Sequence, residues 1–204
     1  PLYSSAASDV YKRQNLSGMP LAANQLAMRF YPPAWLFLLL PINLTFNLLF
    51  VFHLFWGGLG TYRLLRVGFD LDPIPALAGA LTFALGGKLL AHAAGGHVSM
   101  VGAVAWMPWT IWGGTMLLRQ HRMRWAVLAA VALAMQIATH SLITLYTGYF
   151  LAVYLVWEIP NIKFQISNPK SKIPLARRSG WANLRPLSLL SIPILAALLG
   201  AAQL

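Results

Sequence analysis

The sequence contains no cysteine and very few charged residues, and these two absences narrow the class of protein. Without cysteine, the chain cannot form disulfides, cysteine zinc sites or thiol nucleophiles. Charged residues make up only 9% of the chain, against about 25% in an average soluble domain. Hydrophobic residues make up 58%. Because a water-facing surface cannot be built from this composition, we predict an integral membrane protein.

Three long runs without any Lys, Arg, Asp or Glu support this prediction, namely residues 30–62, 89–118 and 125–157. Each run exceeds the roughly 20 apolar residues that cross a bilayer as a helix. Backbone amides in hydrocarbon must be bonded within their own segment, which favours helices. The expected fold class is therefore all-α, a polytopic transmembrane helical bundle.

Two polar turns divide the longest runs. One is the Gly95-Gly96 pair between His92 and His97, and the other is Thr139-His140-Ser141. With both turns in place, most of the fifteen Lys and Arg residues fall on one side, which the positive-inside rule makes cytoplasmic. About six spans follow, at 42–62, 74–91, 98–118, 125–139, 141–157 and 187–204.

The same pattern predicts how the chain is divided, and we expect it to be incomplete at both ends. The polar start matches nothing downstream and resembles a translated sequencing adapter. Residues 33–40 are too short to span, and Pro41 ends that stretch. The expected parts are a non-native tail (1–14), an outer loop with a short interfacial or half-inserted segment (15–41), a five-span core (42–158), a basic cytoplasmic loop (159–186) and a truncated transmembrane helix (187–204).

This topology places Lys88, His92, His97 and His140 on or near the outer face, together with Arg29. The histidines either contact a polar substrate or simply form interfacial turns; a divalent metal is the least favoured partner, since no outer Asp, Glu or Cys accompanies them. Lys88 and Arg29 either neutralise a phosphate or extend toward the interface. The net charge of +11 belongs to the cytoplasmic loops and does not indicate nucleic acid.

Other distinctive residues are better explained by packing. His53, near the middle of the first span, is expected to be a core histidine bonded to a backbone carbonyl. Trp106, Trp109 and Trp112 form one stripe, and we expect them to pack against a neighbouring helix. Glycines in the first two spans are expected to allow close helix contact.

The outer face lacks carboxylates. The four acidic residues are Asp9 in the suspected tail, Asp70 and Asp72 in a cytoplasmic loop, and Glu158 at the cytoplasmic end of a span. A general base on the outer face must therefore come from elsewhere, or be a histidine.

The order of several short motifs from Gly18 onward resembles the YfhO-like bacterial membrane proteins, which are related to GT-C polyprenyl-phosphate-sugar glycosyltransferases. The matching pieces are Gly18-Met19-Pro20 with Ala23-Asn24, Phe30-Tyr31-Pro32, Gly58-Leu59-Gly60-Thr61-Tyr62-Arg63, Ala84-Leu85-Gly86-Gly87 with His92 and His97, Ala105-Trp106-Met107-Pro108-Trp109, Gln136 with His140, and Tyr146. The chain departs from the family at Asn24-Gln25-Leu26, where Asn-Pro-Gln is frequent, and at Thr139-His140-Ser141-Leu142, where Gly-His-Pro-Gln is frequent.

The resemblance implies transfer of a sugar from a polyprenyl-phosphate carrier to a cell-envelope acceptor, on the outer face of the bacterial plasma membrane. The catalytic Asp of such enzymes follows the first transmembrane helix, so we expect it upstream of this chain, which would be inactive alone. The substrate-binding residues are then Asn24, Arg29, Tyr31, Lys88, His92, His97 and His140, and no cofactor is identified. The alternative is a non-catalytic transporter or an assembly subunit for envelope polymers.

Overall fold

The structure, a computed structural model, describes residues 27–167, with side chains from 27 to 158. Every element in this range is helical, which confirms the all-α class there. The predicted tail 1–14, most of the outer loop and the predicted span 187–204 lie outside the described residues. The elements are η3 (Pro32–Leu38), α2 (Ile42–Arg63), η4 (Leu64–Gly68), α3 (Pro73–Ala84), α4 (Gly87–Ala94), α5 (Val98–Gln120), α6 (Met123–Ile137) and α7 (Ser141–Ser167).

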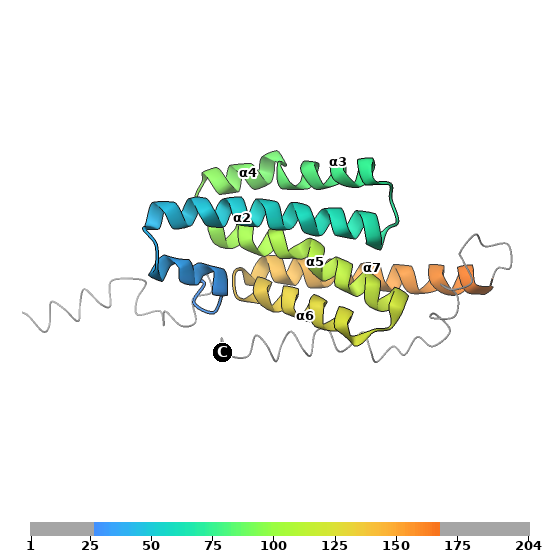
Figure 1. The fold of residues 1–204 in the computed structure, drawn as a ribbon. Coiled ribbons are helices and arrows are strands. Elements are labelled where there is room, and N and C mark those ends of the chain that lie inside the picture. Colours follow the sequence, from blue (N-terminus) through green and yellow to red (C-terminus); the bar gives the residue numbers. More distant parts are fainter. Residues whose placement is uncertain (1–26, 168–204) are drawn as a thin grey trace, which may run out of the picture.

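The helices run up and down along a common axis, so that their connections gather at two ends of the bundle (Figure 1). Residues 27–41, 95–97 and 138–140 lie at one end, called here the histidine end. Residues 69–72 and 121–122 lie at the other, the arginine end. The central helix is α5, which contacts α2, α4, α6 and α7. Helices end at both predicted polar turns, since α4 ends at Ala94 and α6 ends at Ile137.

Among the described residues, three helical stretches are long and apolar enough to cross a membrane: Ile42–Gly68, Pro73–Ala94 and Ser141–Glu158. Much of their apolar surface faces outward; Val51 and Phe55 on α2, for example, are 67% and 66% exposed. A shorter apolar helix, α6, has 15 residues. Such an apolar exterior is what a bilayer, and not water, would solvate. The described part of the chain is therefore the helical bundle of a membrane protein.

Two of the predicted boundaries differ from the structure. The predicted continuous span 74–91 is interrupted, because α3 ends at Ala84 and α4 begins at Gly87. Gly86 caps α4 with an extended ψ of 131°, and a Cβ there would lie 3.0 Å from the Thr82 carbonyl oxygen. The absence of a side chain lets the backbone turn at this point. The last described helix runs on to Ser167, beyond the predicted boundary at 158.

The tryptophan stripe packs between helices, as predicted. The rings of Trp109 on α5 and Trp56 on α2 stack with centroids 4.2 Å apart, and Trp109 Nε1 donates a hydrogen bond of 3.1 Å to the Trp56 carbonyl oxygen. Trp112 meets Trp125 of α6 edge to face at 5.2 Å. These aromatic contacts join three helices and give α5 fixed partners on two sides.

Glycines let α2 approach its neighbours closely, which confirms the packing predicted for Gly57, Gly58 and Gly60. A Cβ on Gly57 would lie 3.2 Å from the Ala105 Cα, and a Cβ on Gly58 would lie 3.1 Å from the Ala84 Cβ. Both distances are shorter than ordinary van der Waals contact. Backbones at this separation gain dispersion contacts that larger residues would prevent.

We expect Gly60→Ala to destabilise the bundle by about 1–3 kcal/mol, the usual effect of overpacking. The new Cβ would lie 2.5 Å from Trp109 Nε1, and the indole cannot move without losing its stacking and its hydrogen bond. The matched control is Gly148→Ala in α7, where nothing lies within 4 Å and alanine should be neutral or stabilising. Denaturant unfolding in detergent micelles measures both; equal stabilities would contradict the prediction.

Candidate functional site

Three basic side chains lie at the histidine end. Lys88 and His92 are four residues apart on α4 and therefore share one face of that helix. The ring of His97, which precedes α5, lies 5.5 Å from the ring of His92, edge to face. Lys88 and His97 are exposed, and His92 is half-buried. We call Lys88, His92 and His97 the basic cluster.

No described carboxylate balances this cluster. Within residues 27–158 the acidic side chains are Asp70, Asp72 and Glu158, and all three lie toward the arginine end. Lysine and histidine N–H groups are hydrogen-bond donors suited to phosphate oxygens. The cluster therefore presents donors and positive charge to any anion that reaches this end of the bundle.

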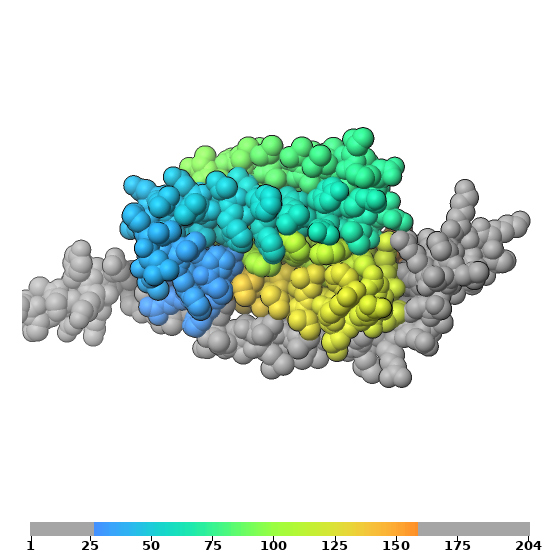
Figure 2. Space-filling model, viewed as in Figure 1, coloured from blue at the N-terminus to red at the C-terminus, as the bar shows by residue number. Residues whose placement is uncertain are grey.

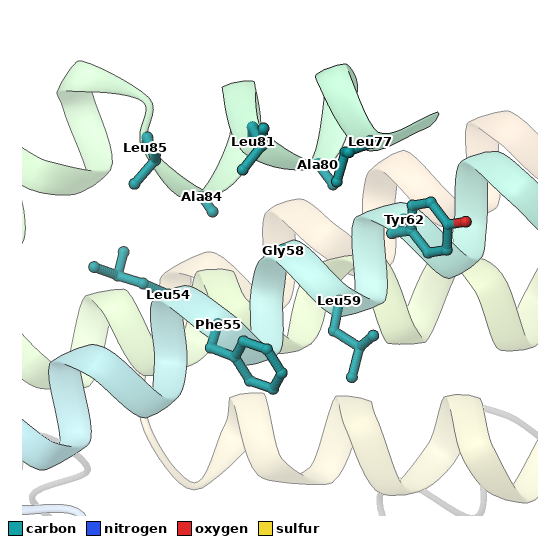
Figure 3. Close-up of a pocket in the computed structure, with 10 residues that line it drawn as sticks. All are labelled: Leu54, Phe55, Gly58, Leu59, Tyr62, Leu77, Ala80, Leu81, Ala84 and Leu85. Carbon is teal, nitrogen blue, oxygen red and sulfur yellow. The ribbon is translucent and has the colours of Figure 1, made fainter. Parts of the chain in front are cut away.

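An apolar groove of about 390 Å³ runs between α2 and α3 (Figure 3). Its lining includes the small residues Gly58, Ala80 and Ala84, where the two helices approach closely, and larger apolar side chains form its walls. Figure 2 shows that α2, α3 and α4 occupy one side of the molecule and α6 the opposite side. The groove is lined by Leu54, Phe55, Gly58, Leu59, Tyr62, Leu77, Ala80, Leu81, Ala84 and Leu85.

One end of the groove is close in sequence to the basic cluster. Leu85, at one limit of the groove, precedes Lys88 by only three residues, across the break between α3 and α4. Tyr62, at the other limit, lies next to the end of α2 at Arg63. An apolar channel that ends beside exposed donors fits a ligand with an apolar tail and an anionic head.

A chain of hydrogen bonds is buried in the interior of the bundle. His53 Nδ1 lies 2.6 Å from the Leu49 carbonyl oxygen, which only accepts, so Nδ1 carries the hydrogen and Nε2 is the acceptor. The Tyr31 hydroxyl, 2.6 Å from Nε2, therefore donates to it. The Tyr31 oxygen in turn accepts a bond of 2.9 Å from Trp106 Nε1. This geometry confirms that His53 is a core histidine bonded to a backbone carbonyl.

The chain joins three parts of the fold. Tyr31 belongs to the segment before η3, His53 to α2 and Trp106 to α5, and both Tyr31 and His53 are fully buried. Burial raises the pKa of the Tyr31 phenol above its ordinary value, which keeps the hydroxyl protonated and able to donate. The short segment at the histidine end is thus held against the helices by directional bonds as well as by apolar packing.

A second buried polar group links α5, α6 and α7. Gln136 Nε2 donates to the Ala103 carbonyl oxygen at 2.8 Å and to Thr147 Oγ1 at 3.0 Å. The two buried groups approach each other at Gly102. A Cβ there would lie 3.3 Å from His53 Nε2 and 3.5 Å from Thr139 Cγ2. Apart from the bond of His53 to a backbone carbonyl, sequence analysis did not predict these contacts, because the residues that make them lie on different helices.

The structure separates the predicted site residues into groups. His92 and His97 are in ring contact, with Lys88 on the same helix face as His92. His140 is half-buried in the turn between α6 and α7 at the same end.

The three remaining predicted residues lie apart from the basic cluster or outside the structure. Arg29 is exposed, and its carbonyl oxygen accepts a hydrogen bond from Trp35 Nε1. Tyr31 is a core residue whose hydroxyl is engaged internally. Asn24 lies outside the described residues.

Two further findings concern ligands and relatives. Across the part of the chain with described side chains, no group of three or more His, Asp or Glu residues is placed to hold a metal ion. Comparison of the chain with models of protein families, with curated proteins and with solved structures found no match. The functional argument therefore depends on the geometry of the groove and the basic cluster.

Proposed function

We propose that the chain is part of an integral membrane glycosyltransferase of the GT-C kind. It would transfer a sugar from a polyprenyl-phosphate carrier to a cell-envelope acceptor, on the outer face of the bacterial plasma membrane. The observation that carries this proposal is the apolar groove between α2 and α3, which ends beside the basic cluster. The choice of polyprenyl phosphate as the carrier comes from the family resemblance in the motif order described above.

The chemistry of the carrier matches this arrangement. A polyprenyl chain is apolar and lengthy, and in the bilayer it would be held in the groove by van der Waals contacts with the side chains of the two helices, since lipid tails are as apolar as the groove. Its phosphate is anionic and needs hydrogen-bond donors at the membrane boundary. Lys88 and His92, on one face of α4, would supply a charge-assisted contact there. His97 adds a donor beside His92.

The proposed topology has six spans. The described helices would supply five, with the arginine end in the cytoplasm and the histidine end outside. Residues 187–204 would supply the sixth. The catalytic base would be an Asp upstream of this chain, so the groove and the basic cluster would hold the carrier rather than perform the proton transfer. Arg29 and His140, at the same end, would face the acceptor.

One observation favours transport as a second candidate function. The break between α3 and α4 lies about 18 Å along a segment of about 33 Å, and transporters often bind solutes at broken helices near mid-membrane. The lining next to the break, at Leu81, Ala84 and Leu85, is apolar, however. His53, the mid-span histidine, has both ring nitrogens engaged. These features suit a lipid chain better than a polar solute.

The direct experiment uses the full-length protein in proteoliposomes with a labelled polyprenyl-phosphate sugar and a cell-envelope fraction. We expect label to move from the carrier to the envelope fraction. His140→Ala is expected to slow this transfer and leave binding of the carrier intact. Uptake of label into the liposomes without transfer would favour the transporter, and absence of both transfer and carrier binding would overturn the proposal.

Filling the groove should weaken carrier binding selectively. Leu81, on the groove wall, is 51% exposed, and Leu81→Trp would place an indole in the space for the chain. We expect a higher KM for a long-chain carrier and little change for a short-chain analogue that does not reach the groove. The matched control is Leu142→Trp on α7, where the leucine is 49% exposed and lies outside the groove. Equal KM values for the two variants would remove the groove from the carrier site.

A further inference from the structure

Gln136 leaves one hydrogen-bond acceptor without a partner in the interior of the bundle. Both of its amide hydrogens are engaged, by the Ala103 carbonyl oxygen and by Thr147 Oγ1. Its Oε1 is buried and has no partner among the residues that the structure describes. The whole side chain is 0% exposed, so bulk water does not reach the oxygen.

The orientation of this amide is determined by its partners. The Ala103 carbonyl oxygen can only accept, so the atom facing it at 2.8 Å must be the amide nitrogen. The Thr147 hydroxyl already donates to the Ile143 carbonyl oxygen, so its oxygen accepts from the same nitrogen. Rotating the amide by 180° would oppose two acceptors at Ala103. The partnerless atom is therefore the carbonyl oxygen, and it requires a donor.

His140 offers a second partnerless atom on the same helical turn. Its backbone N–H bonds to the Gln136 carbonyl oxygen at 2.8 Å, so one α-turn joins the two residues where α6 ends at Ile137. Its Nδ1 is buried and has no partner within residues 27–158. An imidazole nitrogen either donates or accepts, depending on the tautomer.

We propose that Gln136 and His140 bind a hydroxyl group between α5, α6 and α7. The hydroxyl hydrogen would be donated to Gln136 Oε1, and the hydroxyl oxygen would accept from Nδ1–H of His140. Leaving a buried acceptor unsatisfied is unfavourable, and a bound hydroxyl would remove that cost. An anion would be repelled by the amide oxygen. A metal ion would lack a third protein ligand among the described residues.

The hydroxyl belongs either to an ordered water or to a sugar. Water needs only space and polar partners, and it would be present in the protein without substrate. A sugar hydroxyl would enter only when the bundle opens at the turn between α6 and α7; that source rests on the proposed function, whereas the water does not. Nuclear magnetic resonance distinguishes them, with the full chain in lipid nanodiscs and 15N-labelled glutamine.

The measurement is the cross-relaxation between water and the Gln136 side-chain amide hydrogens. A slowly exchanging water signal in the protein alone would identify bound water. A shift of the Gln136 amide only on addition of glucose or N-acetylglucosamine would identify a sugar hydroxyl. Absence of both would overturn the proposal. The exposed Gln120, whose Oε1 accepts bonds from Arg124 and Trp125, is the internal reference.

Two variants assign the signal. Gln136→Leu should remove the resonance; if that variant does not fold, Thr147→Val should still shift it by removing one acceptor. His140→Phe should abolish the water or sugar signal while the Gln136 bonds to Ala103 and Thr147 persist. A signal unchanged in His140→Phe would exclude His140 from the site. These readouts do not involve sugar transfer, so the hydroxyl site and the proposed function can fail separately.

Discussion

Replacing Lys88 with alanine is expected to lower sugar transfer by the full-length protein about 10- to 100-fold, mainly through a higher KM for the carrier. Lys88 is the one lysine or arginine of the basic cluster, and its face of α4 also carries His92. A hydrogen bond to a charged group is worth about 1.5–3 kcal/mol, and each 1.4 kcal/mol is a factor of about ten. The measurement is transfer rate against carrier concentration in proteoliposomes.

Lys88→Arg and a basic residue at the other end serve as controls. Lys88→Arg keeps the charge and should retain much of the activity. Arg124→Ala removes a cation that is also exposed, at the arginine end, where it bonds to Gln120 and lies over the Trp125 ring, and should leave the KM unchanged. If Lys88 only extends toward the interface, its alanine variant will behave like Arg124→Ala, and the proposed phosphate contact is wrong.

Removing the Tyr31 hydroxyl is expected to destabilise the bundle by about 2–4 kcal/mol. Tyr31→Phe keeps the ring but leaves His53 Nε2 and Trp106 Nε1 without their partner. Each buried group left unsatisfied costs about 1–3 kcal/mol. The measurement is the free energy of unfolding in detergent micelles. Tyr149→Phe makes the same chemical change at a tyrosine that is 73% exposed, and should alter stability by less than about 0.5 kcal/mol.

A double variant tests the coupling between Tyr31 and His53. Adding His53→Leu to Tyr31→Phe removes the acceptor that the first change leaves unpaired. The double variant should therefore be less destabilised than the sum of the two single variants, because neighbours that share a bond are not additive. Additive losses would show that Tyr31 and His53 are not coupled, and would contradict the hydrogen bond between them.

Local patterns in the sequence predicted several features of the fold correctly. The polar turns at 92–97 and 139–141 indicated helix ends that the structure shows at Ala94 and Ile137. The same local reasoning failed at Leu85–Gly86, although Gly86-Gly87 followed by Lys88 is the same kind of turn signal as Gly95-Gly96. Hydropathy over a whole span records composition and not backbone direction, so the apolar residues on both sides outweighed this short interruption.

The candidate site was predicted only in part. Lys88, His92 and His97 were predicted to lie on or near the outer face of the membrane. The ring contact between the two histidines follows from the short turn that separates them. Tyr31 was expected to contact substrate, and the structure places it in the core with a histidine 22 positions later and a tryptophan 75 positions later. Sequence spacing gives no measure of such contacts, since they depend on which helices pack together.

The sequence by itself determined the environment and the secondary structure of this protein. Scarce charge and long apolar runs require a bilayer, and a bilayer requires helices, because each backbone amide must be satisfied locally. Tertiary structure alone decided which side chains meet: the groove between α2 and α3, the partners of Tyr31 and the partnerless oxygen of Gln136. Helix packing selects these neighbours through side-chain shape and small residues distributed over the whole chain, which no local pattern contains.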